Sequence, residues 1–180
     1  TVELSLRLVE DKKTKIFTAT NLSSVLETFD QIAVIAPPGT GKTTTLLQLA
    51  DATLNNAASV AVFIPLSEWS TGTESFFQSL MKRSSFKEAI EQQLDLLAQN
   101  GNLVLILDGW NELDETSKKR VRSDAQALKR DFPELRLVIS SRHNDFDIPI
   151  DGPVVEVELL NEVQQLDLAK GLRGSDGESL

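Results

Sequence analysis

Residues 36–44 read Ala36-Pro37-Pro38-Gly39-Thr40-Gly41-Lys42-Thr43-Thr44, and this run indicates the fold more clearly than any other part of the chain. A small residue, four variable positions and then Gly-Lys-Thr form the pattern of a phosphate-binding loop. In such a loop the backbone N–H groups point inward and surround an anion. Gly39 and Gly41 permit backbone angles and a close approach that a Cβ would obstruct. All nine residues are therefore candidate nucleotide-binding residues, although Ala36 stands where the pattern often has glycine.

Two side chains of this loop have individual roles. Lys42 places a compact positive charge against the β- and γ-phosphates, which also makes it a candidate catalytic residue. Thr43 offers a hydroxyl to Mg²⁺, an ion that takes few protein ligands and keeps most of its waters. A helix that begins at Thr43 would direct the positive end of its dipole toward the phosphates.

The flanking sequence fits this interpretation. Residues 32–35 are a short apolar run, typical of a buried strand. Residues 43–54 have the periodicity of a helix. We expect one side of that helix to carry Leu46, Leu47, Leu49, Ala50 and Leu54. Strand, glycine-containing loop and helix are the context that the loop requires.

Composition limits the function further. The chain has 180 residues, enough for one domain with a core of its own, and a net charge of −9. This charge argues against direct contact with nucleic acid. It does not exclude ATP, because distant charges are screened beyond about 8 Å at physiological salt. The absence of cysteine excludes disulfides and thiol chemistry and is compatible with the cytoplasm.

The ends of the chain suggest an excised piece. The chain begins Thr-Val-Glu-Leu, without an initiator Met or a signal peptide, and its last residues are rich in Gly, Ser and Asp. No apolar run approaches the ~20 residues of a membrane helix. We expect a cytoplasmic fragment of a longer protein.

Periodicity divides the chain into three parts. Residues 1–29 hold an alternating strand at 2–9, a returning strand at 16–18 and a short helix at 22–29. Residues 30–172 form the core, and residues 173–180 a flexible tail. The core strands are expected at 32–36, 60–66, 103–107, 135–139 and 154–159.

Helices are expected between these core strands. They cover 43–54, about 73–82, a segment that a capping box opens at Ser85 and Gly101 ends, 115–131, and 161–172. Strands that alternate with helices predict a three-layer α/β sheet with right-handed crossovers. The unbroken aliphatic run 103–107 is typical of a strand buried on both faces. Pro65 indicates that its strand lies at an edge.

The second half of the site follows the buried strand 103–107. Asp108 lies at the carboxyl end of that strand, where ligands bind in open α/β sheets. There it can hold the Mg²⁺ that Thr43 also contacts, through water. Glu112 can polarise the water that attacks the γ-phosphate. Gly109 lets the chain turn sharply after the strand.

The fourth core strand ends in Ser140-Ser141-Arg142. If this strand lies between the phosphate-loop strand and the Asp108 strand, its end is next to the γ-phosphate. Ser140 or Ser141 could then donate a hydrogen bond, and Arg142 could bind phosphate as a bidentate fork. The alternative for both Glu112 and Arg142 is a solvated surface side chain.

The chain resembles the NACHT family, within the signal-transduction ATPases with numerous domains (STAND). The matching segments are 36–44, 63–66, 105–113 and 138–142, which span most of residues 30–172. The resemblance implies a P-loop NTPase core with strand order 5-1-4-3-2 that acts as an ATP/ADP switch. It assigns Asp108 to Mg²⁺, Glu112 to the water and Arg142 to sensing of the γ-phosphate, and it places part of adenine recognition near residues 14–24.

Two departures from the family matter. Asn111 stands where the family usually has a second Asp, and an amide can orient a water but cannot accept its proton. The chain also stops before the helical and winged-helix regions that close over the nucleotide in the family. Slow hydrolysis and dependence on missing domains are the consequences we expect.

Other residues give weaker signals. His143 is expected to be a solvated loop residue. Lys118, Lys119, Arg120 and Arg122 form a basic cluster that is either a solvated face or a contact to a neighbouring subunit. Trp69 and Trp110 are expected to pack in the core, and Trp110 lies beside the site.

Three functions compete. The first is a switch with slow Mg²⁺-dependent ATP hydrolysis that controls signalling or self-association. The second is a ring-forming AAA+-type ATPase, with Arg130 or Arg136 as the residue that reaches a neighbouring subunit. The third is a nucleotide-binding scaffold without turnover. A GTPase is disfavoured because no Asn-Lys-x-Asp sequence is present, and a small-molecule kinase because no acceptor pocket can be identified.

Overall fold

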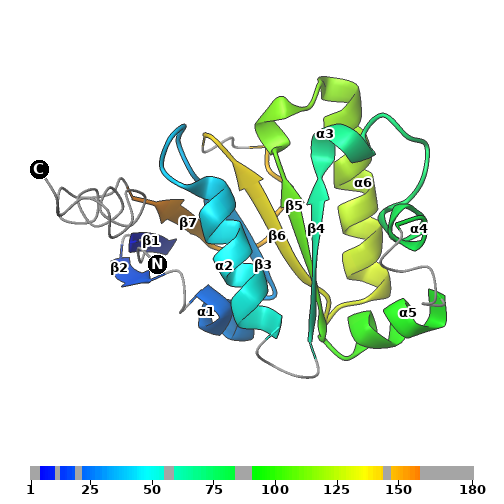
Figure 1. Ribbon diagram of the computed structural model, residues 1–180, viewed down its shortest axis with the longest axis horizontal. Coiled ribbons are helices and arrows are strands. Elements are labelled where there is room, and N and C mark those ends of the chain that lie inside the picture. Colours follow the sequence, from blue (N-terminus) through cyan, green and yellow to red (C-terminus); the bar gives the residue numbers. More distant parts are fainter. Residues whose placement is uncertain are drawn as a thin grey trace, which may run out of the picture.

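One sheet runs through the centre of the molecule (Figure 1). The computed structural model describes residues 5–10, 13–18, 22–54, 59–83, 91–143 and 147–158. Its strands are β1 Ser5–Glu10, β2 Lys13–Thr18, β3 Gln31–Ile35, β4 Val60–Pro65, β5 Leu103–Asp108, β6 Arg136–Ser141 and β7 Val154–Val157. In this part of the chain the sheet has seven strands in the order β2-β1-β7-β3-β6-β5-β4.

The five core strands are parallel and lie in the order β7-β3-β6-β5-β4. In core numbering this is 5-1-4-3-2, so the predicted order is confirmed. The strand β6 pairs with β3 on one side and with β5 on the other. Because parallel strands end at the same edge of a sheet, this order brings the end of β6 between the phosphate loop and Asp108.

The N-terminal hairpin continues the sheet. The strands β1 and β2 pair antiparallel, as the hairpin prediction requires, and β1 also pairs antiparallel with β7, with Leu6 opposite Val157. The hairpin therefore covers the edge of β7. The sequence predicted the two strands but gave no sign of their partner.

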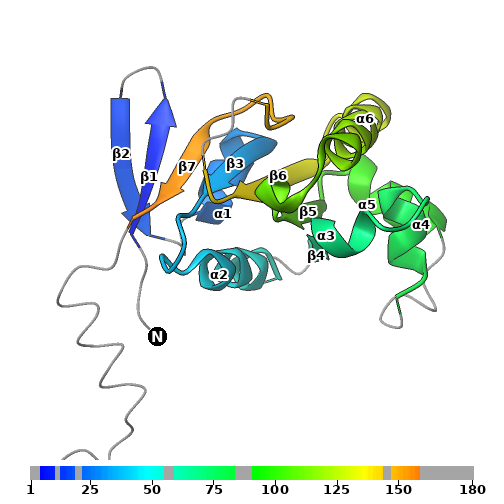
Figure 2. The ribbon, with the colours of Figure 1, turned by 90° about the horizontal axis from the view of Figure 1, so that it is seen from above.

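Helices cover both faces of the sheet (Figure 2). One face carries α1 Leu22–Thr28 and α2 Lys42–Leu54, and α6 Glu115–Asp131 covers the other. The short helices α3 Leu66–Trp69, α4 Phe76–Met81 and α5 Glu91–Gln99 pack into the same core cluster as α6. Alternate residues of β5 belong to the two clusters, and residues 103–107 are all fully buried. Burial of this strand on both faces is thus confirmed.

The predicted apolar side of α2 is wrong at two positions. Leu47 and Leu54 are each 56% exposed, whereas Thr45 and Thr53 are buried in their place. The Thr53 hydroxyl donates to the Leu49 carbonyl at 2.9 Å, and the Thr45 hydroxyl donates to the Gly41 carbonyl at 3.2 Å. A threonine that donates to a carbonyl four residues back satisfies its hydroxyl within the helix, so its methyl group can face the core. The helix also begins at Lys42, one residue before the predicted start.

The segment between β4 and β5 contains an additional short helix, α3, that was not predicted. The helix α3 begins directly after Pro65, and α4 begins at Phe76 behind a capping box formed by Ser75 and Gln78. The capping box predicted at Ser85 lies outside the described residues, as does the predicted helix 161–172. Gly101, with φ of +66°, ends α5 as predicted.

The solvated-face interpretation of the basic cluster on α6 is wrong for three of its four members. Arg120 stacks at 4.1 Å over the Trp69 ring and donates to the carbonyls of Gly72 and Glu74. Lys118 and Arg122 lie 5.5 and 5.8 Å from the centroid of the Trp110 ring. Lys119 alone is exposed.

The last strand of the sheet, β4, has Pro65 at its end, so the predicted edge position is confirmed. Arg83, which follows α4, donates to the Phe63 carbonyl of this strand at 2.6 Å. No helix in the described part of the chain is long and apolar enough to cross a membrane.

Candidate nucleotide-binding site

A pocket of about 350 Å³ lies at the carboxyl end of the parallel strands. Its lining comprises Ala36, Pro37, Pro38, Gly39, Gly41, Lys42, Thr43, Thr44 and Arg142. These are the residues of the predicted phosphate loop except Thr40, together with the arginine that follows β6. Thr40 is buried, and its hydroxyl donates to the Pro37 carbonyl at 2.7 Å, which stabilises the turn of the loop.

Backbone conformation explains the two glycines of the loop. Gly39 and Gly41 have φ angles of +81° and +89°, a region that other residues rarely occupy. Among the described atoms, none lies within 4 Å of the place that a Cβ of Gly39 would take, so the backbone angle decides its identity. The helix α2 begins at Lys42, within the loop, and its first three residues line the pocket. The N–H groups of a first helical turn have no partner in their own helix and suit an anion.

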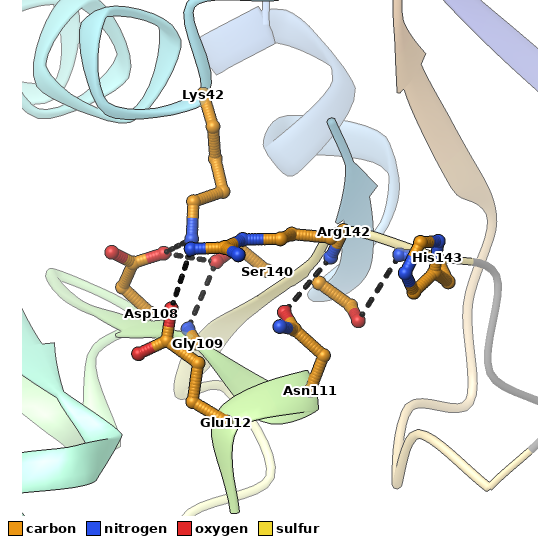
Figure 3. Close-up of polar contacts among 9 residues, drawn as sticks. Lys42, Asp108, Gly109, Asn111, Glu112, Ser140, Arg142 and His143 are labelled. Atoms are coloured by element: carbon orange, nitrogen blue, oxygen red, sulfur yellow. Dashed lines mark hydrogen bonds and ion pairs between the residues drawn. The ribbon is translucent and has the colours of Figure 1, made fainter. Parts of the chain in front are cut away.

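Lys42 crosses from the loop to the end of β5 (Figure 3). Its Nζ lies 2.8 Å from Oδ1 of Asp108, and the two side chains are only 14% and 18% exposed. The charge that the loop presents to a phosphate is therefore balanced by the carboxylate when no phosphate is present. A phosphate oxygen that enters the pocket competes with Asp108 for the same ammonium group.

Ser140 fixes the orientation of the Asp108 carboxylate. Its fully buried hydroxyl donates to Asp108 Oδ1 and accepts from the Gly109 N–H at 3.2 Å. A serine hydroxyl has one hydrogen, which here points to the carboxylate rather than into the pocket. The predicted donation to phosphate therefore does not describe Ser140 in this structure. The neighbouring Ser141 joins the strand to the loop, since its carbonyl accepts from the Ala36 N–H at 3.0 Å.

The 3₁₀ helix η3, Trp110–Glu112, binds the segment after β6 through each of its residues. The Trp110 indole N–H donates to Asp147 Oδ1 at 3.1 Å, and Asn111 Oδ1 accepts from the Arg142 N–H at 2.9 Å. Glu112 Oε1 lies 3.2 Å from the Arg142 guanidinium. Asn111 thus anchors Arg142 in this structure, a task that requires only a side-chain oxygen and that an aspartate could also perform.

Gly109 makes room for Glu112. Its φ of +96° turns the chain after β5, as predicted. A Cβ at this position would lie 3.1 Å from Glu112 Oε2, so the carboxylate folds back over the glycine toward the end of the strand. The Glu112 side chain is 38% exposed.

Asp147 is a residue that the sequence did not single out. It receives the Trp110 indole and lies 3.4 Å from Lys118 and 3.7 Å from Arg122. Burial acts to raise the pKa of this carboxyl, but the indole hydrogen bond and the Lys118 charge together lower it. Trp110 is fully buried, as predicted. His143 is exposed, also as predicted.

The donors at the pocket fit Mg²⁺. Thr43 is exposed and lines the pocket, and the described contacts of the Asp108 carboxylate fall on Oδ1, while Oδ2 points away from Lys42 and Arg142 (Figure 3). In the described residues no three His, Cys, Asp or Glu side chains gather into a metal cluster. Thr43 and Asp108 are hard oxygen donors that suit an ion held mainly by water and phosphate, and such an ion would neutralise phosphate charge.

Neither a protein-family model nor a curated protein matches the sequence. Solved structures do match. With C. elegans PCH-2 the TM-score is 0.52 at 19% identity, covering 78% of this chain and 38% of that one. With AMPPCP-bound DnaA from Aquifex aeolicus it is 0.55 at 17% identity, covering 89% and 50%. With the replication initiator DnaA bound to AMPPCP and single-stranded DNA it is 0.52 at 17% identity, covering 84% and 49%.

The chain spans half or less of these solved chains. At such identities the likeness concerns the fold. The parallel core, its strand order and these neighbours together show that the chain has the α/β fold of the P-loop NTPases.

Proposed function

We propose that this chain is the nucleotide-binding core of an ATP/ADP switch of the NACHT type, with slow Mg²⁺-dependent ATP hydrolysis. In a longer protein of the cytoplasm, this switch would control signalling or self-association. The observation that supports it best is the meeting of Lys42, Asp108, Glu112 and Arg142, from three separate segments of the chain, at one pocket.

Each of these residues has a role in the proposal. The loop residues 36–44 bind the phosphates, and Lys42 moves from Asp108 to the β- and γ-phosphates. Thr43 and Asp108 hold Mg²⁺. Arg142 reads the γ-phosphate, because it lines the pocket opposite the loop and presents a fork that suits phosphate. Glu112 orients and polarises the attacking water.

Asn111 supports slow rather than rapid turnover. Its side-chain oxygen accepts from the Arg142 N–H, and an amide cannot accept a proton from an attacking water. A switch does not need speed. It needs a difference in binding free energy between its states, about 5.5 kcal/mol for a near-complete reversal of populations.

A ring-forming AAA+-type ATPase is the second candidate, favoured by the likeness of the fold to PCH-2 and DnaA. Such an enzyme would complete its site with an arginine from a neighbouring copy. Arg130 is 74% exposed and contacts Asp131, the next residue, at 2.9 Å. It would be accessible to a neighbour, so turnover that rises with protein concentration would favour this candidate.

The deciding experiment is a calorimetric titration of the chain with Mg·ATP, Mg·ADP and Mg·GTP, followed by single-turnover hydrolysis of bound ATP. We expect micromolar binding of both adenine nucleotides, no binding of GTP, and hydrolysis that is slow and independent of protein concentration. Binding without any hydrolysis would favour a scaffold. The absence of nucleotide binding by the folded chain would contradict all three functions.

A further inference from the structure

Arg142 lies between the phosphate loop and the Glu112 carboxylate. Its side chain lines the pocket together with the phosphate loop, and its guanidinium lies 3.2 Å from Glu112 Oε1 (Figure 3). The side chains of Arg142 and Glu112 are 47% and 38% exposed, so both can be reached by a ligand in the pocket.

Neighbouring residues hold this pair in place from both sides. Asn111 Oδ1 accepts from the Arg142 N–H at 2.9 Å, which fixes the start of the arginine. On the other side, Glu112 can fold back over Gly109 because glycine has no Cβ. A Cβ at position 109 would lie only 3.1 Å from Glu112 Oε2. Asn111 and Glu112 are neighbours in the 3₁₀ turn η3. The ion pair is therefore built into the turn that follows β5.

Carboxylate and phosphate offer a guanidinium the same chemistry, namely a pair of anionic oxygens in a fork arrangement. In the binding mode proposed above, the γ-phosphate is the group of a triphosphate that meets Arg142, and a diphosphate lacks it. A triphosphate would then take the guanidinium from Glu112, and a diphosphate would leave the pair intact.

We propose that Glu112 sets the preference of the pocket between triphosphate and diphosphate by competing with the γ-phosphate for Arg142. This inference rests on the nucleotide-binding function proposed above. The cost of breaking the ion pair falls on ATP alone, which lowers the ratio of ATP to ADP affinity. The same displacement releases Glu112, so the carboxylate becomes available to the water only when a γ-phosphate is bound.

The test is a double-mutant cycle. The affinities of the non-hydrolysable ATP analogue AMPPCP and of ADP, both with Mg²⁺, are measured for wild type, Glu112→Gln, Arg142→Gln and the double variant. We expect Glu112→Gln to raise the AMPPCP/ADP affinity ratio about two- to fivefold, the factor that an exposed ion pair represents. We expect a smaller gain when the same change is made in the Arg142→Gln background.

Simple charge repulsion predicts the opposite order. If Glu112 only repels the phosphates, its removal has the larger effect once Arg142 no longer neutralises it. The inference would therefore be overturned if Glu112→Gln raised the AMPPCP/ADP affinity ratio in the Arg142→Gln background by as much as, or more than, it does in the wild type. Glu115→Gln is the matched control, because it removes the same charge from a side chain that is 82% exposed, and it should leave the ratio unchanged.

The experiment separates the two levels of the proposal. If wild type binds neither nucleotide, the proposed function fails and the inference fails with it. If wild type binds both and the cycle shows no coupling of the expected sign, only the inference fails. Arg142→Lys provides a second variant at this position, since it keeps the charge but loses the fork and should give an intermediate ratio.

Discussion

Ser140 shows what a single buried hydroxyl does for this site. It accepts from the Gly109 N–H and donates to Asp108, so it joins the turn after β5 to the carboxylate that faces Lys42. The sequence analysis suggested that Ser140 or Ser141 donates to the γ-phosphate, whereas in the structure the Ser140 hydroxyl donates to Asp108. Partner choice depends on which rotamer the buried hydroxyl adopts between two strands, and spacing along one chain does not contain that information.

Gly109→Ala should disturb both the turn and Glu112. A non-glycine residue at positive φ costs about 1–2 kcal/mol, and its Cβ would press on a carboxylate 3.1 Å away. We expect the melting temperature to fall by roughly 2–8 °C, measured by circular dichroism, together with slower single-turnover ATP hydrolysis. Gly72→Ala is the control, because a Cβ there would make an ordinary contact at 3.6 Å. Equal effects of both substitutions would contradict this account.

Lys42→Ala should abolish nucleotide binding and leave the fold intact. The ammonium group is the only part of this side chain that neutralises Asp108 and, in our proposal, the phosphates, while Ser140 still holds the carboxylate in the variant. Titration with Mg·ATP measures the loss, and an unchanged far-UV spectrum verifies the fold. The exposed Lys119→Ala serves as control. Retention of wild-type ATP affinity by the Lys42 variant would refute the assigned site.

At the scale of elements, the short turn η3 connects the site to the crossover between β6 and β7. Trp110, Asn111 and Glu112 each contact that crossover, through Asp147 or Arg142. A displacement of Arg142 by phosphate would therefore be transmitted to the crossover. The basic residues of α6 that hold Asp147 belong to the same assembly, which explains why they do not form a solvated face.

Asp147→Asn should weaken this connection in a pH-dependent manner. The pKa of Asp147 is lowered in the folded chain, so the carboxylate stabilises the fold above its ordinary pKa of about 3.9, and this contribution is lost as the pH falls through the lowered value. We expect a loss of about 0.5–1 kcal/mol at pH 7, after allowance for solvent screening. Urea unfolding at a series of pH values from 7 to 3 would measure it. A difference from wild type that grows toward acid would contradict the prediction.

The elements differ in how well the sequence predicted them. The strand β5 was predicted because its residues 103–107 are all aliphatic and all buried. The helix α6 was predicted at its observed bounds, whereas its N-cap, Asp114, was not predicted. The buried side of α2 was predicted less well, because Thr45 and Thr53 face the core through hydroxyls satisfied within the helix, while two leucines face outward. Hydropathy alone cannot distinguish a satisfied threonine from an exposed one.

At the scale of the whole molecule, the parallel core follows from the alternation of strands and helices, and the phosphate loop indicates which edge of the sheet carries the site. The position of the hairpin did not follow. Its strand β1 pairs with β7, far along the chain, and only the assembled sheet shows that β7 requires a neighbour on that side.

Removal of residues 1–20 should lower stability without loss of the site. The deletion leaves the backbone groups of β7 that now pair with β1 without their partner. We expect a loss of about 2–4 kcal/mol, given roughly 1 kcal/mol for each net hydrogen bond lost, and a melting temperature lower by roughly 5–15 °C. The residues that line the pocket lie in other segments of the chain, so inorganic pyrophosphate should bind as before. Loss of that binding in a folded variant would show that the hairpin supports the site.

The opposite margin of the sheet carries a further consequence. Pro65 has no N–H there, and the Phe63 carbonyl already accepts a hydrogen bond from Arg83. Two backbone positions along β4 are therefore unable to pair with an incoming strand. Edge-to-edge aggregation and strand exchange between copies are therefore discouraged at this margin, even when the chain is concentrated. Copies of the protein that meet at this margin would be joined by side-chain surfaces rather than by a continuous intermolecular sheet.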